Sequence, residues 1–158
     1  MNDFRKATRI GVIGGRTADK KTLEAARRVG ELIARAGAVL VCGGLGGVMA
    51  AAASGARKAD GLTVGILPGN DPGEANMHID VPIATGLGYT RNSLVAMNSD
   101  ALIAIDGGYG TLSEIAYGNI YNKPVIGLAT WELDGVIVAE SPEKAVELAL
   151  DAVKNGGR

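Results

Sequence analysis

The sequence predicts an α/β fold in which a mostly parallel sheet is sandwiched between helices, and three observations lead to this prediction. Apolar runs of strand length alternate with segments of helical periodicity along the whole chain. Most of these runs are continuous, which is typical of strands that are buried on both faces. Short glycine groups follow several runs, where the chain must turn sharply. The length of 158 residues fits one domain covering 1–158.

Each element has its own local signals. Seven strands are predicted, at 9–13, 38–41, 62–67, 79–84, 101–105, 124–128 and 136–138. Helices are predicted at 19–36, 48–59, 90–98, 111–122 and from Ser141 onward. Gly37 ends the first helix, Thr90 is expected to cap the third, and Ser141-Pro142 opens the last. The polar residues 70–77 are predicted to form a surface loop.

Composition limits the classes of partner. The 16 basic and 17 acidic residues nearly balance, so neither nucleic acid nor a membrane surface is expected as a partner. Residues 36–56 carry no charge and are long enough for a membrane span, but their central glycines favour a strand, a turn and a helix. Cys42 is the single cysteine, and no secretory signal is recognised, so a cytoplasmic location is expected. His78 has no second histidine or cysteine at ligand spacing, and no metal site is predicted.

Three glycine groups follow predicted strands, at Gly14-Gly15, Gly43–Gly47 and Gly107–Gly110. In open parallel sheets, ligands bind beyond the carboxyl ends of the strands, near the point where the strand order reverses. The second group does not fit a dinucleotide fingerprint, because Met49 stands where a third glycine or alanine belongs. A second phosphate or sugar contact is the better interpretation of that group.

The segment from Asp106 to Glu114 is the strongest local signal. An apolar strand leads into a glycine turn and then a helix, whose first amide groups and positive dipole end attract anions. The hydroxyls of Thr111 and Ser113 could add hydrogen bonds. A structural interpretation stays open, in which Thr111 and Glu114 form a capping box; Glu114 is then a cap rather than a pocket carboxylate.

Two arginines are candidates for binding a phosphate. Arg91 stands at a predicted helix start, where its charge opposes the helix dipole, so a bidentate phosphate contact would explain it. A surface arginine paired with a carboxylate is the alternative. Arg16 is a weaker candidate of the same kind. Tyr109 and Trp131 could stack on a flat ring, although packing is the default for both.

These motifs resemble those of a known superfamily. The matching segments are Gly61–Gly69, Ala75-Asn76, Thr85–Gly88 with Arg91-Asn92, and Ser99–Ala101 leading into Gly107–Glu114. They are similar to the "possible lysine decarboxylase" superfamily, which includes the cytokinin-activating phosphoribohydrolases called LOG. The resemblance covers about residues 8–130 and is closer to a branch of largely uncharacterised proteins that includes the molybdenum cofactor carrier protein.

The resemblance implies a Rossmann-like fold, a homo-oligomer (dimer or tetramer) and a nucleotide-like ligand. Gly107, Gly108, Gly110 and Thr111 match the phosphate cradle of the phosphoribohydrolases, while Arg91 and Glu114 match their catalytic Arg and Glu. Two positions depart from the enzyme pattern: Asn92 replaces a Lys, and Asp106 replaces a Pro. Both departures lower the positive charge available to the site.

Two functions therefore stay open. The first is a carrier that binds a phosphorylated pterin such as molybdenum cofactor, or a related nucleotide, with no cofactor of its own required. The second is an N-glycosidic hydrolase of nucleoside 5′-monophosphates, in which Arg91 and Glu114 are catalytic. A role in binding single-stranded DNA is disfavoured by the balanced charge. Lysine decarboxylation is not expected, because no lysine lies inside the glycine motifs. The predicted ligand-binding residues are Gly14, Gly15, Gly43, Gly44, Gly46, Gly47, Arg91, Gly107, Gly108, Gly110, Thr111 and Glu114.

Overall fold

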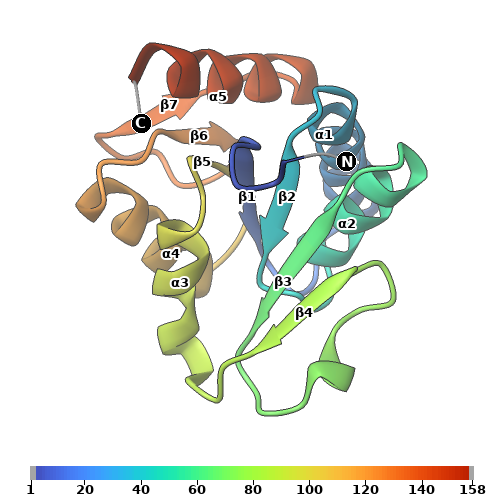
Figure 1. The fold of residues 1–158 in the computed structure, drawn as a ribbon. Coiled ribbons are helices and arrows are strands. Elements are labelled where there is room, and N and C mark those ends of the chain that lie inside the picture. The colour runs from blue at the N-terminus through green and yellow to red at the C-terminus, as the bar shows by residue number, and fades with distance from the viewer. Residues whose placement is uncertain (1–2, 157–158) are drawn as a thin grey trace.

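A computed structural model describes residues 3–156 and contains a seven-stranded sheet with the strand order β4-β3-β2-β1-β5-β6-β7 (Figure 1). All six neighbouring strand pairs are parallel. The strands are β1 (Arg9–Gly14), β2 (Val39–Cys42), β3 (Thr63–Leu67), β4 (Val81–Ala84), β5 (Ala101–Ile105), β6 (Val125–Leu128) and β7 (Val136–Val138). Each predicted strand is confirmed within two residues at either end.

Helices cover both faces of this sheet and complete three layers. The helices are α1 (Lys20–Arg35), α2 (Val48–Lys58), α3 (Asn92–Met97), α4 (Tyr109–Ile120) and α5 (Pro142–Gly156), with short 3₁₀ turns η1 (Pro72–Glu74) and η2 (Gly88–Arg91). One apolar core joins α1, α2 and α5 to the sheet, and a second joins α3 and α4 to the opposite face. The predicted Rossmann-like three-layer α/β fold is therefore confirmed.

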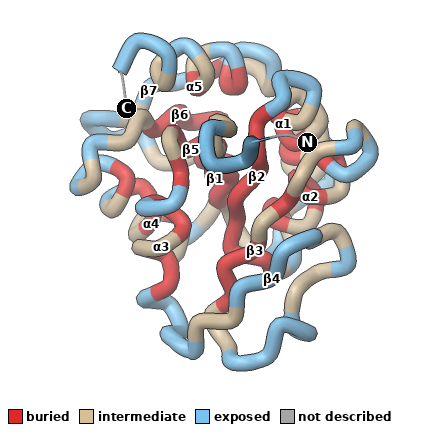
Figure 2. The backbone as a smooth tube through the Cα atoms, in the orientation of Figure 1, coloured by how far each residue is buried: buried red, intermediate tan, exposed pale blue. Residues whose placement is uncertain are grey.

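The continuous apolar runs are explained by these two cores. Ile10 and Val12 of β1 pack in the α1/α2/α5 core, whereas Ile13 packs in the α3/α4 core. Successive side chains of a strand point to opposite faces, so a strand with apolar contacts on both sides needs an unbroken apolar sequence. Figure 2 shows the consequence, with buried backbone running through the central strands and exposed backbone at the loops and outer helices.

Glycines let α1 and α2 approach one another at backbone distance. A Cβ atom added to Gly30 would lie 1.9 Å from the carbonyl oxygen of Ala52, and one added to Gly55 would lie 1.9 Å from that of Arg27. Neither position has room for a side chain, so the contact depends on glycine in both helices. The helix pair therefore packs on the sheet as one thin layer.

The order of the strands creates one reversal point. The chain builds β1 to β4 outward in one direction, then crosses back so that β5 pairs with the other side of β1. The carboxyl ends of β1 and β5 are consequently neighbours, with Gly14 opposite Ile105. This crevice is where ligands of open α/β sheets bind.

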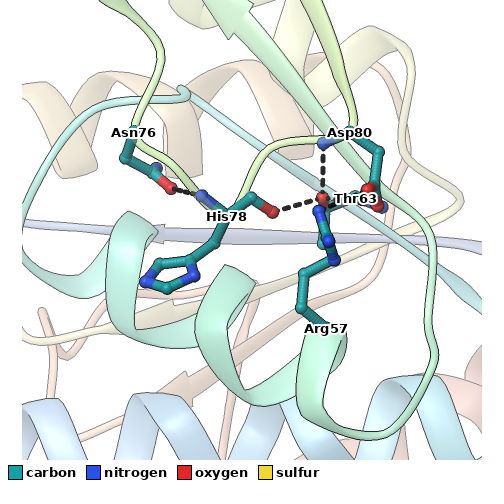
Figure 3. Close-up of polar contacts among 5 residues, drawn as sticks. All are labelled: Arg57, Thr63, Asn76, His78 and Asp80. Carbon is teal, nitrogen blue, oxygen red and sulfur yellow. Dashed lines mark hydrogen bonds and ion pairs between the residues drawn. The ribbon is translucent and has the colours of Figure 1, made fainter.

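Polar contacts fix the start of edge strand β4 to β3 (Figure 3). The Asp80 carboxylate accepts a hydrogen bond from the Thr63 amide at 3.0 Å and pairs with Arg57 at 2.5 Å. The Thr63 hydroxyl donates to the carbonyl oxygen of His78 at 2.6 Å, and Asn76 accepts from the His78 amide at 3.0 Å. His78 is thus held by its backbone. Within residues 3–156 no group of three potential metal-binding side chains is found.

Three sequence expectations need comment. Thr90 does not cap the third helix, because 3₁₀ turn η2 runs from Gly88 to Arg91 and the Thr90 carbonyl oxygen accepts from the Ser93 hydroxyl instead. The fourth helix begins at Tyr109, two residues before its predicted start. Residues 36–56 form the end of α1, β2, a glycine turn and α2, and no helix in the described part of the chain is long and apolar enough to cross a membrane.

Candidate ligand-binding site

A cavity of about 190 Å³ opens at the reversal point, between the loop after β1 and the start of α4. Seven of the predicted ligand-binding residues line it: Gly14, Gly15, Arg91, Gly108, Gly110, Thr111 and Glu114. Arg16, Met49, Tyr89 and Asn92 complete the lining. Residues separated by about one hundred positions in the sequence thus share one site because β1 and β5 are adjacent.

The N-terminus of α4 forms one wall of this cavity. Gly108 is the N-cap, and a Cβ atom added to it would meet no heavy atom within 4 Å. The amide groups of the first helical turn have no acceptor inside the helix, and no side chain at Gly108 shields them. Gly107 has a φ of +102°, and an added Cβ would lie 2.1 Å from the Thr111 hydroxyl. Gly107 therefore allows the turn to pack closely against Thr111, and it does not itself line the cavity.

The capping-box interpretation of this segment is wrong. A capping box requires Thr111 at the N-cap, but the helix begins at Tyr109, so Thr111 is already in its first turn. Both Thr111 and Glu114 are buried and line the cavity. The side chain of Glu114 therefore lines the pocket and does not cap the helix.

Arg91 lies opposite α4 and is 5% exposed. Its guanidinium donates to the carbonyl oxygen of Gly43 at 3.2 Å and to the side-chain oxygen of Asn92. Its Nε is buried and has no hydrogen-bond partner among the described residues. Burial lowers the pKa of Arg91 from its ordinary value, while the nearby Glu114 carboxyl opposes this shift. The alternative of a surface arginine paired with a carboxylate is wrong.

Glu114 is 5% exposed, and its carboxyl group is close enough to Arg91 to interact with it electrostatically. Burial raises its pKa from 4.5 to about 8, and the positive charge of Arg91 offsets only part of that rise. The raised pKa favours the neutral form of the Glu114 carboxyl group near pH 7. In that form it leaves the charges of Arg91 and Arg16 in the cavity unopposed, which favours a bound dianion.

Asn92 joins the two helices that face the site. Its amide nitrogen donates to the Ser113 hydroxyl at 3.0 Å and to the Gly110 carbonyl oxygen at 3.4 Å, while its oxygen accepts from Arg91. One side chain therefore fixes both Arg91 and the first turn of α4. A lysine at this position could not accept the bond from Arg91, so the sequence departure at Asn92 has a structural role.

The remaining predicted glycines support the site from outside the cavity. Gly43 leaves room for Arg91, because an added Cβ would lie 2.6 Å from its guanidinium nitrogen. Gly47 has a φ of +63° and packs against Gly15, whose carbonyl oxygen accepts from the Val48 amide at 3.0 Å. Gly44 packs against Leu67, and none of Gly43, Gly44, Gly46, Gly47 and Gly107 is in the cavity lining. The exposed side chain of Asp106 also lies outside the lining.

Sequence reasoning did not select Tyr89 and Met49 as lining residues. Met49 is buried and, like Arg91, packs against Gly43. A Cβ atom added to Gly43 would lie 2.8 Å from the Met49 sulfur. Tyr89 is 74% exposed and lies under the Arg16 guanidinium, 6.0 Å from the ring centroid. An aromatic residue two positions before Arg91, in an otherwise polar and glycine-rich segment, was the available signal.

The family of the chain follows from comparison with known proteins. A family model described as the SLOG cluster4 family matches residues 7–155. The chain belongs to the SLOG cluster4 family. A curated relative of this SLOG cluster4 chain is the cytokinin riboside 5′-monophosphate phosphoribohydrolase of Mycobacterium tuberculosis, 37% identical over 125 residues, or 72% of this chain and 66% of the relative.

Two solved structures are similar to this SLOG cluster4 protein over nearly their full length. The molybdenum cofactor binding protein of Rippkaea orientalis is 39% identical, with a TM-score of 0.88 over 94% of this chain and 98% of that one. The molybdenum cofactor carrier protein of Chlamydomonas reinhardtii is 32% identical, with a TM-score of 0.84 over 94% of this chain and 99% of that one. The expected position near the carrier branch of the LOG-like superfamily is confirmed.

Proposed function

We propose that this protein binds a small phosphate monoester at the N-terminus of α4, and that the ligand is molybdenum cofactor or a related pterin phosphate, which the protein carries. One observation carries the proposal: an unshielded helix N-terminus faces a buried arginine in the crevice between β1 and β5. Amide groups at a helix start and a guanidinium are both strong donors to phosphate oxygens.

The electrostatics of the described residues support an anionic ligand. The raised pKa of Glu114 favours its neutral form near pH 7, and in that form it does not neutralise Arg91 and Arg16 inside the cavity. The orphaned Nε of Arg91 points to a missing acceptor, which a phosphate oxygen could supply. Molybdenum cofactor is a pterin with a phosphate monoester, and the two similar structures named for this cofactor favour it over other esters.

The test is retention of the cofactor by purified protein. Molybdenum cofactor released from a donor molybdoenzyme is mixed with the protein, which is then separated from free cofactor and assayed for molybdenum and for oxidised pterin. We expect both in equimolar amounts. The matched variant Gly108→Leu, which places a side chain over the α4 amides, should retain neither. Equal retention by this variant and the unaltered protein would refute the proposed site.

Glu114 supports a second candidate function, hydrolysis of nucleoside 5′-monophosphates. A buried carboxyl group with a pKa of about 8 beside a phosphate site is suited to proton transfer at physiological pH. In this reaction the oxygen of water bonds to the ribose C1′ and the C1′–N bond breaks. Protonated Glu114 can give its proton to the leaving base and take one back from the attacking water, so that it ends the cycle protonated. Release of free adenine from AMP, lost in Glu114→Gln, would establish the enzyme; no release would leave the carrier.

Assembly and location complete the proposal. A homo-oligomer, dimer or tetramer, is supported by the exposed apolar edge strand β4, where Val81 and Ile83 are 42% and 45% exposed. Light scattering with size-exclusion chromatography gives the number of copies, and a monomer would contradict it. A cytoplasmic location and the lack of a nucleic-acid partner stay predictions, the second resting on the net charge of −1.

A further inference from the structure

One aromatic side chain lines the cavity, and two more lie at the glycine turn beside it. The chain has only six aromatic residues, namely one Phe, one Trp and four Tyr. Tyr89 lines the cavity, while Tyr109 starts α4 and contacts Trp131 with a centroid distance of 6.0 Å. Tyr89 and Tyr109 are 74% and 83% exposed, far above what packing in a core would give.

The two tyrosines have different structural partners. Trp131 donates its indole N–H to the Gly108 carbonyl oxygen at 3.2 Å, so the Tyr109–Trp131 pair supports the glycine turn. The ring of Tyr89 instead contacts Arg16, whose guanidinium lies 6.0 Å from the ring centroid. The ring of Tyr89 is thus largely exposed at the edge of the cavity, with the Arg16 guanidinium over one of its faces.

The cavity is too small for a whole pterin or nucleotide. Its volume of about 190 Å³ is below the roughly 300–1,000 Å³ of pockets that enclose a drug-sized ligand. A phosphate at the α4 amides takes up the inner part, so the ring of any larger ligand must lie at the mouth. Tyr89 is the aromatic residue in the cavity lining, and it lies at that mouth.

We propose that the flat ring of the ligand stacks on Tyr89, next to Arg16, so that the site selects phosphate monoesters with a conjugated ring over sugar phosphates. This inference rests on the proposed function, because the phosphate fixes where the ring lies. Stacking between a ring and an aromatic side chain tolerates different ring types. A guanidinium beside the stack adds a second flat contact, since Arg also stacks on aromatic faces.

The test compares two probes that share the phosphate. The ringed probe is 6-hydroxymethylpterin phosphate, which has no N-glycosidic bond to be cleaved, and the ringless probe is ribose 5-phosphate. Calorimetry gives the affinity of each for the unaltered protein, Tyr89→Leu, Tyr89→Phe and the control Leu87→Ala, which changes an exposed apolar residue of the same segment outside the cavity.

Loss of the Tyr89 ring should weaken the pterin probe roughly 5- to 150-fold. Ribose 5-phosphate should change less than about twofold, and Tyr89→Phe and Leu87→Ala should leave both probes within that limit. Quenching of pterin fluorescence on binding, reduced in Tyr89→Leu, is the accompanying signature of stacking.

The outcomes separate this inference from the proposed function. If neither probe binds the unaltered protein, the phosphate site fails and the stacking inference fails with it. If both probes bind and Tyr89→Leu changes neither affinity, the phosphate site stands and stacking is refuted. An equal loss for both probes would also refute stacking, because Tyr89 would then act on the phosphate or through the fold.

Discussion

Replacing Gly108 by leucine should perturb the ligand site while leaving room for the new side chain. The residue has a negative φ of −105°, and an added Cβ meets no heavy atom within 4 Å. Removing a glycine stabilises a chain by about 0.4–1 kcal/mol through the unfolded state. Losing a favoured N-cap residue costs about 1 kcal/mol, so the two effects nearly cancel.

The effect on the ligand is much larger. The leucine side chain projects over amide groups that would otherwise bind the phosphate. Each hydrogen bond to a charged group contributes about 1.5–3 kcal/mol, so the loss of two weakens binding by about 3–6 kcal/mol, or roughly 10²- to 10⁴-fold. Calorimetry with 6-hydroxymethylpterin phosphate measures this loss. Thermal unfolding should show a change in Tm within about 4 °C.

A matched control is Gly156→Ala, at the end of α5, where an added Cβ also meets nothing within 4 Å. This change should leave the affinity unaltered and should raise Tm by no more than about 4 °C. The reasoning is refuted if a folded Gly108→Leu protein binds the pterin phosphate as tightly as the unaltered protein. A large fall in Tm for Gly108→Leu would instead show that the space around Gly108 is needed for folding.

Three further predictions concern stability. Between pH 4.5 and about 8 the folded chain keeps a proton on Glu114 that the unfolded chain has released. The free energy of unfolding should therefore fall as pH rises, by at most about 1.4 kcal/mol per pH unit. In urea unfolding, Glu114→Gln should lack this pH-dependent component, and a pH profile identical to that of the unaltered protein would contradict the prediction. Asn92→Ala removes the hydrogen bonds to Ser113 and Arg91. The free energy of unfolding should fall by about 1–3 kcal/mol, with a decrease in Tm of about 2–4 °C per kcal/mol. Ser113→Ala should destabilise the protein less, and an equal destabilisation would count against the role of Asn92 in holding Arg91. Gly30→Ala forces a Cβ to within 1.9 Å of the Ala52 carbonyl oxygen and should destabilise the protein by about 1–3 kcal/mol or more; a Tm equal to that of Gly156→Ala would show that the α1–α2 contact relaxes freely.

The strands could be predicted because their burial leaves a direct mark on the sequence. Ile10, Val12 and Ile13 pack into two different cores, so β1 is apolar at each of these positions. Helix starts were harder to predict. At α4 a glycine is the N-cap, so the Thr111–Glu114 spacing imitates a capping box that the helix does not form. At Thr90 a 3₁₀ turn precedes the helix and moves its start to Asn92.

The site could be predicted only in part, because its inner wall depends on contacts between distant segments. Gly107 to Glu114 signals an anion site through its local sequence, and Gly108, Gly110, Thr111 and Glu114 of that segment line the cavity. The burial of Arg91 depends on the space left by Gly43, which is 48 residues away. Gly44 and Gly47 have the composition of a ligand loop but lie outside the cavity lining. An added Cβ would meet Leu67 of β3 at Gly44 and the backbone of Gly15 and Arg16 at Gly47, so both positions permit close packing.

Trp131 gives the protein a built-in optical reporter for this turn. It is the only tryptophan in the chain, and its indole N–H is bonded to the carbonyl oxygen of Gly108. Excitation at the red edge of the tryptophan absorption band therefore yields emission from one fluorophore. Its indole is hydrogen-bonded to Gly108, the N-cap residue of α4. A dianion bound at the adjacent amides changes the electric field across that indole, so occupancy can be followed by emission wavelength without any label.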